Sequence, residues 1–187
     1  MPARALSGCR EGRGTDVDEA VRQQLVSLLP RLRRFAYGLA GSVDDGDDLV
    51  QSACERALTR LDQWQPGTRL DSWMYRIVQT VWIDRMRTRR RREGVGDGPD
   101  PDSLPGGDLD RELEARSTLV AVRREVARLP DDQRAVLLLV SVEGLSYRQA
   151  AETLDVPIGT VMSRLARARL ALGKALADAP NLKAAAG

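Results

Sequence analysis

One face of the segment 158–172 combines small residues with arginines, a pattern suited to contact with duplex DNA. Apolar residues recur there at helical spacing and should face a core: Val161, Leu165, Ala168 and Leu172. At about 100° per residue, the opposite face is small, polar and basic: Gly159, Thr160, Ser163, Ala166 and Arg167, with Arg164 and Arg169 on its flanks. Such a face lets a helix lie deep in a major groove while guanidinium groups donate to phosphates or guanine edges. The alternative interpretation is a helical hairpin with a solvated charged face.

The residues before this helix predict a helix-turn-helix. Ser146 followed by Gln149 forms a capping box, so a first helix should begin at Ser146. Asp155 and Val156 interrupt the apolar pattern, and Pro157 suits the first position of the second helix. A cap, a short turn and a small basic face together favour DNA binding over a plain hairpin.

Composition limits the possible functions. The chain has 187 residues, 30% of them charged and 4% aromatic, which is typical of a helical protein with one or two domains. Of its 29 basic residues, all but Lys174 and Lys183 are arginine, and histidine is absent. We therefore expect no enzyme, no metal and no cofactor, because no cluster of nucleophile and acid–base groups is present. Cys9 and Cys54 stand far apart without metal-ligand spacing. Two such cysteines favour a location in the reducing cytoplasm. No apolar run is long enough for us to expect membrane insertion.

A change of composition divides the chain into two all-helical domains. The segment 94–112 is rich in Gly, Pro and Asp, so we expect a flexible linker there. It separates a helical domain over 16–93 from a four-helix domain over 113–178 that ends with the helix-turn-helix. The N-terminal segment 1–15 and the tail 179–187 are expected to be disordered.

The segment 71–92 predicts a second basic helix. Trp73, Ile77 and Val81 form its expected core stripe. Another face carries residues spaced by four, three and four: Arg76, Thr80, Ile83 and Arg87. A Pro-Gly loop precedes the helix and carries Trp64 and Arg69, residue types that single-stranded DNA recognition uses. The alternatives are a solvated helix end and a plain connecting loop.

Three motifs in this order resemble the extracytoplasmic-function (ECF) sigma factors, the compact two-domain branch of the bacterial sigma family. They are DDLVQSACERAL (47–58), LDSWMYRIVQTVWIDRMRTRRRR (70–92) and GLSYRQAAETLDVPIGTVMSRLARARLAL (144–172). The likeness covers roughly residues 25–92 and 113–175. The chain departs from the family at Thr80, where Asn is common, and at Met162, where a basic or polar residue is common.

The resemblance implies a subunit that directs core RNA polymerase to a promoter subset and assists promoter opening. Its implied partners are the β′ clamp helices and β flap of core polymerase, promoter DNA, and an anti-sigma protein. The residues implied to bind the polymerase clamp helices are Asp48, Gln51 and Glu55; a solvated acidic face is the alternative. Those implied for the single-stranded −10 element are Trp64, Arg69, Arg76, Thr80, Ile83 and Arg87. Those implied for the −35 duplex are Thr160, Ser163, Arg164, Arg167 and Arg169.

Two other functions fit parts of the pattern. A sigma-like decoy that binds an anti-sigma protein needs no DNA surface, yet both basic helices are present. A helix-turn-helix regulator leaves the acidic segment 47–58 and the Pro-Gly loop without a role.

We also expect Asp84, near the core stripe, to form a structural ion pair with a neighbouring arginine.

Overall fold

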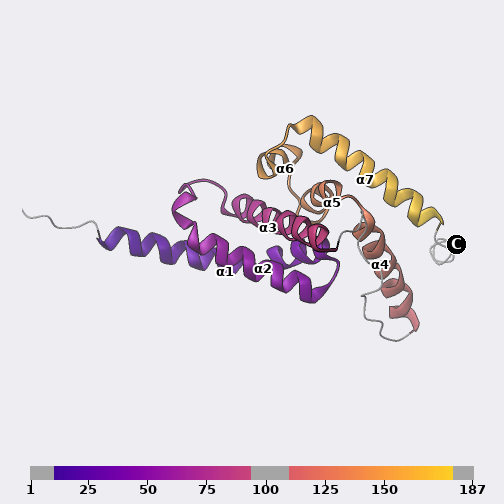
Figure 1. Cartoon of the computed structure of the whole chain (residues 1–187), viewed down its shortest axis with the longest axis horizontal. Helices are drawn as coiled ribbons and strands as arrows, with labels where there is room; N and C mark the ends of the chain where they lie inside the picture. The colour runs from indigo at the N-terminus through magenta and orange to yellow at the C-terminus, as the bar shows by residue number, and fades with distance from the viewer. Residues whose placement is uncertain (1–10, 94–109, 179–187) are drawn as a thin grey trace, which may run out of the picture.

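The computed structural model describes residues 11–93 and 110–178, and every regular element within these ranges is a helix (Figure 1). The all-helical prediction is therefore confirmed for this part of the chain. Within the same ranges, no helix combines the length and the apolar character needed to cross a bilayer.

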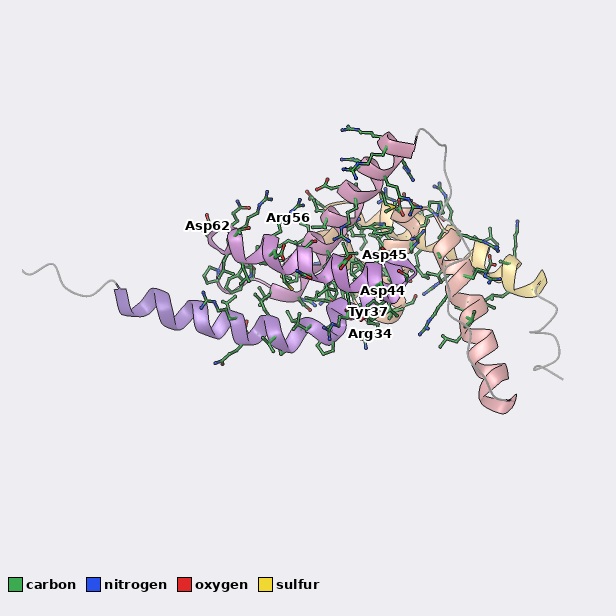
Figure 2. All side chains as sticks on the ribbon, turned by 60° about the horizontal axis from the view of Figure 1, so that its bottom comes forward. Arg34, Tyr37, Asp44, Asp45, Arg56 and Asp62 are labelled. Carbon is green, nitrogen blue, oxygen red and sulfur yellow. The ribbon has the colours of Figure 1, made fainter. Side chains whose placement is uncertain are left out.

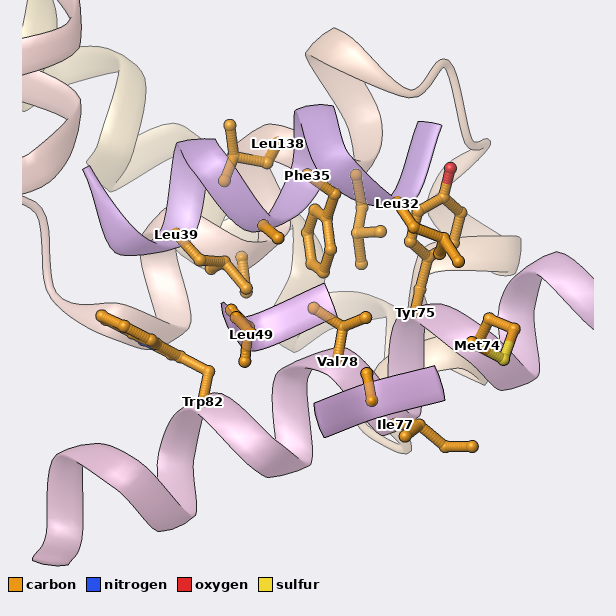
Figure 3. Close-up of a cluster of buried hydrophobic side chains, with 14 of the residues drawn as sticks. Leu32, Phe35, Leu39, Leu49, Met74, Tyr75, Ile77, Val78, Trp82 and Leu138 are labelled. Carbon is orange, nitrogen blue, oxygen red and sulfur yellow. The ribbon is translucent and has the colours of Figure 1, made fainter. Parts of the chain in front are cut away.

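The N-terminal helices are α1 (Glu11–Ala40), α2 (Val43–Thr59) and α3 (Leu70–Glu93), with a short 3₁₀ turn, η1 (Leu61–Gln63), between the last two. Their buried side chains belong to one apolar core that continues into the C-terminal helices, from which Leu138 joins it (Figure 3). Phe35 of α1 meets Tyr75 of α3 edge to face, with ring centroids 5.1 Å apart. Leu39, Leu49 and Val78 fill the adjoining space and are fully buried.

The buried stripe of α3 differs from the prediction. Ile77 and Val81 are buried as expected, but Trp73 is only partly buried. Met74 and Val78 are instead fully buried. The reason is that α3 packs on α1 and α2 and also on the C-terminal helix α6, so its buried surface is wider than one helical stripe.

The C-terminal helices are α4 (Asp110–Arg128), α5 (Asp131–Leu137), η2 (Leu138–Val142), α6 (Tyr147–Leu154) and α7 (Ile158–Asp178). The element η2 is a single π turn that continues α5, in which the Glu143 amide donates to the Leu138 carbonyl oxygen. The run from Ala135 to Leu139 is buried, whereas Val142 at the end of η2 has an exposed fraction of 44%. Gly144 follows with φ +73°, a conformation that favours glycine and ends the run.

Helix also extends into two segments predicted to be irregular. α1 begins at Glu11 and not near Asp16, and α4 begins at Asp110 although 94–112 was expected to be linker. The sequence DRELEAR at 110–116 is rich in helix-forming residues and places acidic groups in the first turn. At α1, adding turns to an existing helix is easier than starting one, which explains the earlier start. The remaining residues of the predicted linker and both tails lie outside the described residues.

Candidate nucleic-acid and protein interfaces

The helix-turn-helix forms as its sequence predicted. The Gln149 amide donates to the Ser146 hydroxyl over 3.2 Å, and the Ser146 amide donates to Gln149 Oε1 over 2.9 Å. Both halves of the capping box are therefore present at the start of α6. Asp155 ends α6 in the left-handed conformation with φ 56°, which Asp adopts more readily than most residues. This turn sets the direction of α7.

The five residues predicted for −35 DNA do not share one environment. Val161, Leu165 and Ala168 of α7 are buried against the C-terminal helices, as expected. Ser163, Arg167 and Arg169 are exposed, and Thr160 is half-buried. Arg164 differs, because its Nε lies 2.8 Å from the Asp132 carboxylate of α5. The exposed part of the predicted set is therefore centred on Ser163 and Arg167, while Arg164 also connects α7 to α5.

The −10 residues of α3 lie beside the helix-turn-helix. Thr80 and Arg87 are exposed, and Ile83 is half-buried. Arg76 is exposed, but its guanidinium donates to the Thr153 carbonyl over 3.0 Å and to the Glu152 carbonyl over 2.7 Å. These carbonyls belong to the C-terminal end of α6, which a cation stabilises. The structure thus joins the predicted −10 helix to the predicted −35 unit through Arg76.

The loop before α3 holds Trp64 and Arg69 in different ways. Trp64 is half-buried and packs against the core, and its indole Nε1 has no hydrogen-bond partner among the described residues. Arg69 is exposed and donates to the Asp71 carboxylate over 2.7 Å and 3.1 Å. Burial raises the pKa of Asp71, but hydrogen bonds from Arg69 and from the Ser72 amide outweigh it and hold the pKa below its usual value.

The predicted polymerase-binding residues form an exposed polar surface on α2. Asp48, Gln51 and Glu55 are all exposed, and Gln51 donates to Glu55 over 3.1 Å. Their spacing of three and four places them along one face. Figure 2 shows Asp44 and Asp45 at the N-terminal end of α2, near Tyr37 of α1. The structure therefore keeps the three residues together and accessible.

A basic groove of about 550 Å³ lies between α2 and α3 beside this surface. It is lined by four arginines, one acid and three other residues: Arg56, Arg85, Arg89, Arg92, Asp84, Ser52, Val81 and Thr88. Arg56 lies 3.1 Å from Asp84, which confirms the predicted structural ion pair. Within the described ranges, no group of three or more acidic, cysteine or histidine side chains is arranged to hold a metal ion.

Sequence reasoning missed Glu143, the residue that connects the two sets of helices most directly. Its side chain is fully buried and accepts hydrogen bonds from Tyr75 over 2.6 Å, Arg34 over 2.8 Å and Arg31 over 3.3 Å. Burial raises the pKa of Glu143, but the hydrogen bonds from Arg34 and Tyr75 outweigh it, so the pKa lies below its usual value. Nothing in the sequence marks this residue, because a Glu-Gly pair before a helix is typical of a solvated turn.

Apolar and backbone contacts extend the same interface. Leu138 lies against Gly38 of α1, where an added Cβ would come within 2.5 Å of a Leu138 methyl carbon. Arg134 is buried and donates to the Leu39 carbonyl at the end of α1 and to the Leu129 carbonyl. The Trp82 indole donates to Asp131 over 3.2 Å. The two sets of helices are thus packed together in this structure.

Residues 119–172 match the family described as Sigma-70, region 4, and residues 25–79 match the Sigma2 domain of PhyR. The ECF RNA polymerase sigma factor EcfG of Rhodopseudomonas palustris is 36% identical over 161 residues, covering 84% of this chain and 86% of that protein. The ECF RNA polymerase sigma factor SigW of Bacillus subtilis is 30% identical over 165 residues, covering 79% of this chain and 84% of that protein.

Solved structures give the same result. The sigma factor RpoE in complex with the anti-sigma factor NepR from Bartonella quintana has a TM-score of 0.69 at 30% identity, covering 86% of this chain and 98% of that one. CnrH in complex with the cytosolic domain of CnrY has a TM-score of 0.64 at 26% identity, covering 86% and 90%. The helix-turn-helix, the two matched sigma regions and the near full-length likeness to EcfG together show that the chain belongs to the ECF RNA polymerase sigma factors.

Proposed function

We propose that this ECF sigma factor recognises the −35 duplex with α7 and the single-stranded −10 element with α3 and the loop before it. The observation that carries the proposal is the exposed face of α7, where Ser163 and Arg167 lie opposite the buried Val161 and Leu165. Arg167 can donate two hydrogen bonds to a guanine edge, while Arg169 on the flank can bind a phosphate. In this proposal the chain contributes promoter recognition, and the chemistry of RNA synthesis belongs to the polymerase.

Recognition of the −10 element requires a change from the arrangement described here. Arg76 uses its Nε and one terminal nitrogen on the α6 carbonyls of Thr153 and Glu152. A DNA base that needs these donors has to displace α6 from α3. We therefore propose that the chain separates its two sets of helices when it engages a promoter, and that the loop with Trp64 and Arg69 then holds a base extruded from the DNA.

The exposed surface of α2 is the proposed contact with core polymerase. Asp48 and Glu55 can pair with basic residues of the β′ clamp helices, and Gln51 can add a hydrogen bond. The C-terminal helices would contact the β flap. Since core polymerase and promoter DNA are both cytoplasmic, the cytoplasm is the proposed site of action.

We also propose that an anti-sigma protein binds this chain. RpoE and CnrH, two similar structures, were each solved in complex, RpoE with the anti-sigma factor NepR and CnrH with the cytosolic domain of CnrY. In such a complex the partner would compete with the polymerase or with DNA for the faces described above.

A second candidate function is a decoy for an anti-sigma protein. One observation favours it: residues 25–79 match the Sigma2 domain of PhyR, and an anti-anti-sigma factor of that name has been solved with NepR. A decoy has no use for a DNA-recognising face, whereas Ser163 and Arg167 are exposed in this chain. This difference makes the sigma function the better supported of the two.

Transcription from a promoter library by core polymerase with this protein tests the proposal. A sigma factor should produce transcripts from promoters that share −35 and −10 motifs, and Arg167→Ala should relax the −35 motif at one position. A decoy would bind an anti-sigma protein and give no promoter-specific transcript.

A further inference from the structure

The exposed face of α7 has one polar edge and one apolar edge. At about 100° per residue, the side chains across it run in the order Arg167, Ser163, Ala166 and Met162. All four are exposed, and Met162 has an exposed fraction of 48%. Arg164 lies beyond the polar edge and is tied to Asp132. Arg169, the proposed phosphate contact, lies on the Met162 side of the face but about two turns further along the helix. The proposed base contacts use Arg167 and Ser163, so the apolar edge in the first two turns of α7 has no assigned role.

Met162 can recognise only a restricted set of base edges. Its thioether has no hydrogen-bond donor and is a weak acceptor. In the major groove, guanine, cytosine and adenine present polar atoms that would lose water against Met162 without gaining a partner, which is unfavourable. Thymine adds the one apolar group of the groove, its C5 methyl.

The position of Met162 along α7 places it where contact with bases is expected. It lies in the second turn of a helix that starts at Ile158, and recognition helices contact base edges with their N-terminal residues. Gly159 precedes it, and a Cβ built on Gly159 would meet no atom within 4 Å. On the face that carries Ser163 and Ala166, Gly159 therefore adds no side chain, and the space in front of it is open.

We infer that Met162, together with the small Ala166 beside it, selects a pyrimidine with a C5 methyl group at one position of the −35 element. In unmodified DNA this pyrimidine is thymine, and in methylated DNA 5-methylcytosine offers the same group. The inference rests on the proposed −35 role of α7 and adds a second specificity residue to Arg167.

Removing a single methyl group from the DNA tests the inference. Holoenzyme with the wild-type chain first selects its −35 motif from randomised duplexes, and each thymine of that motif is then replaced by deoxyuridine, which lacks only the methyl. At one position, the replacement should weaken binding by wild-type holoenzyme roughly three- to fivefold, the effect of burying about one methyl group. Met162→Ala should bind the thymine duplex more weakly by a similar factor and show no difference between thymine and deoxyuridine.

Leu170→Ala is the matched control. Leu170 is also exposed and apolar, with an exposed fraction of 62%, but it lies eight residues further on, about 12 Å along the helix. Holoenzyme with Leu170→Ala should keep the full difference between thymine and deoxyuridine. Cytosine and 5-methylcytosine at the same position show whether the methyl group alone is selected. Tighter binding with 5-methylcytosine than with cytosine means that it is, and equal binding assigns the contact to thymine.

Three results would overturn the inference. They are a selected motif without thymine, deoxyuridine that is neutral at every position, and a thymine preference that persists in Met162→Ala. Each of them leaves the −35 role of α7 intact, because a motif has still been selected. Failure of wild-type holoenzyme to select any −35 motif would instead contradict the proposed function itself.

Discussion

Replacing Glu143 by glutamine should open the contact between the N-terminal helices (α1–α3) and the C-terminal helices (α4–α7). The substitution keeps the size of the side chain and removes the charge that faces Arg31, Arg34 and Tyr75. Hydrogen bonds to a charged group contribute about 1.5–3 kcal/mol each. Screening by solvent reduces the contributions of Arg31 and Arg34, because their side chains are 36% and 54% exposed.

The net cost of Glu143→Gln is therefore about 1–2 kcal/mol, since the amide oxygen can still accept from Tyr75. Glu143→Ala also leaves the buried Tyr75 hydroxyl without its acceptor, which adds about 1–3 kcal/mol. Because 1.4 kcal/mol changes an equilibrium tenfold, glutamine should raise the ratio of open to closed chains roughly 5- to 30-fold. The alanine variant should raise it further.

Single-molecule energy transfer measures this ratio directly. Dyes can be attached through cysteines introduced at Leu58 on α2 and Lys174 on α7, both exposed, after Cys9 and Cys54 have been replaced. The wild type should show mostly high transfer efficiency, and Glu143→Gln should add a population with low efficiency. Far-UV circular dichroism checks that the helices remain folded.

Glu125→Gln is the matched control, because Glu125 pairs with Arg128 on the same helix and does not join the two sets of helices. It should leave the distribution of transfer efficiencies unchanged. If Glu143→Gln and Glu143→Ala also leave it unchanged, the buried carboxylate does not hold the closed arrangement and the reasoning fails.

Three further predictions concern the exposed face of α7, the exposed surface of α2 and the pH dependence of the Glu143 contact. Arg167→Ala should reduce the free energy of DNA binding by about 1–3 kcal/mol and relax specificity at one −35 position, whereas Arg169→Ala should weaken binding to all sequences alike. Affinities for promoters mutated base by base measure the difference, and unchanged discrimination by Arg167→Ala would rule out base recognition by this residue. Gln51→Ala combined with Glu55→Arg should weaken binding to core polymerase while the melting temperature stays near that of the wild type, because exposed substitutions cost little stability; full affinity would remove this surface from the polymerase contact. The pKa of Glu143 is lowered in the folded chain, so its stabilising contribution to the closed arrangement is present above the ordinary glutamate value of about 4.3 and is lost as the pH falls through the lower folded value. Energy transfer should therefore stay constant from about pH 8 to pH 5. Opening of the chain within that range would contradict the role assigned to Glu143.

The local features of this chain follow from its sequence. The capping box of Ser146 and Gln149 depends on residues three apart, and the buried stripe of Val161, Leu165 and Ala168 depends on the period of one helix. Both were predictable, and so was the exposed position of Arg167, because it follows from the same helical geometry. The ion pair of Asp84 was also predictable in kind, since a carboxylate near a core stripe among arginines needs a partner.

The partners of the long side chains were decided only by the tertiary structure. Glu143 meets Arg34 across 109 positions of the chain, and Arg76 meets Thr153 across 77. Arg164, placed on the flank of the α7 face by its angle, is directed to Asp132 of α5. Helical period determines the side of a helix on which a residue lies, but the partner that its charged end finds depends on which other helix packs there. That choice is made by apolar contacts between distant segments, such as Leu138 against Gly38, and no local pattern contains them.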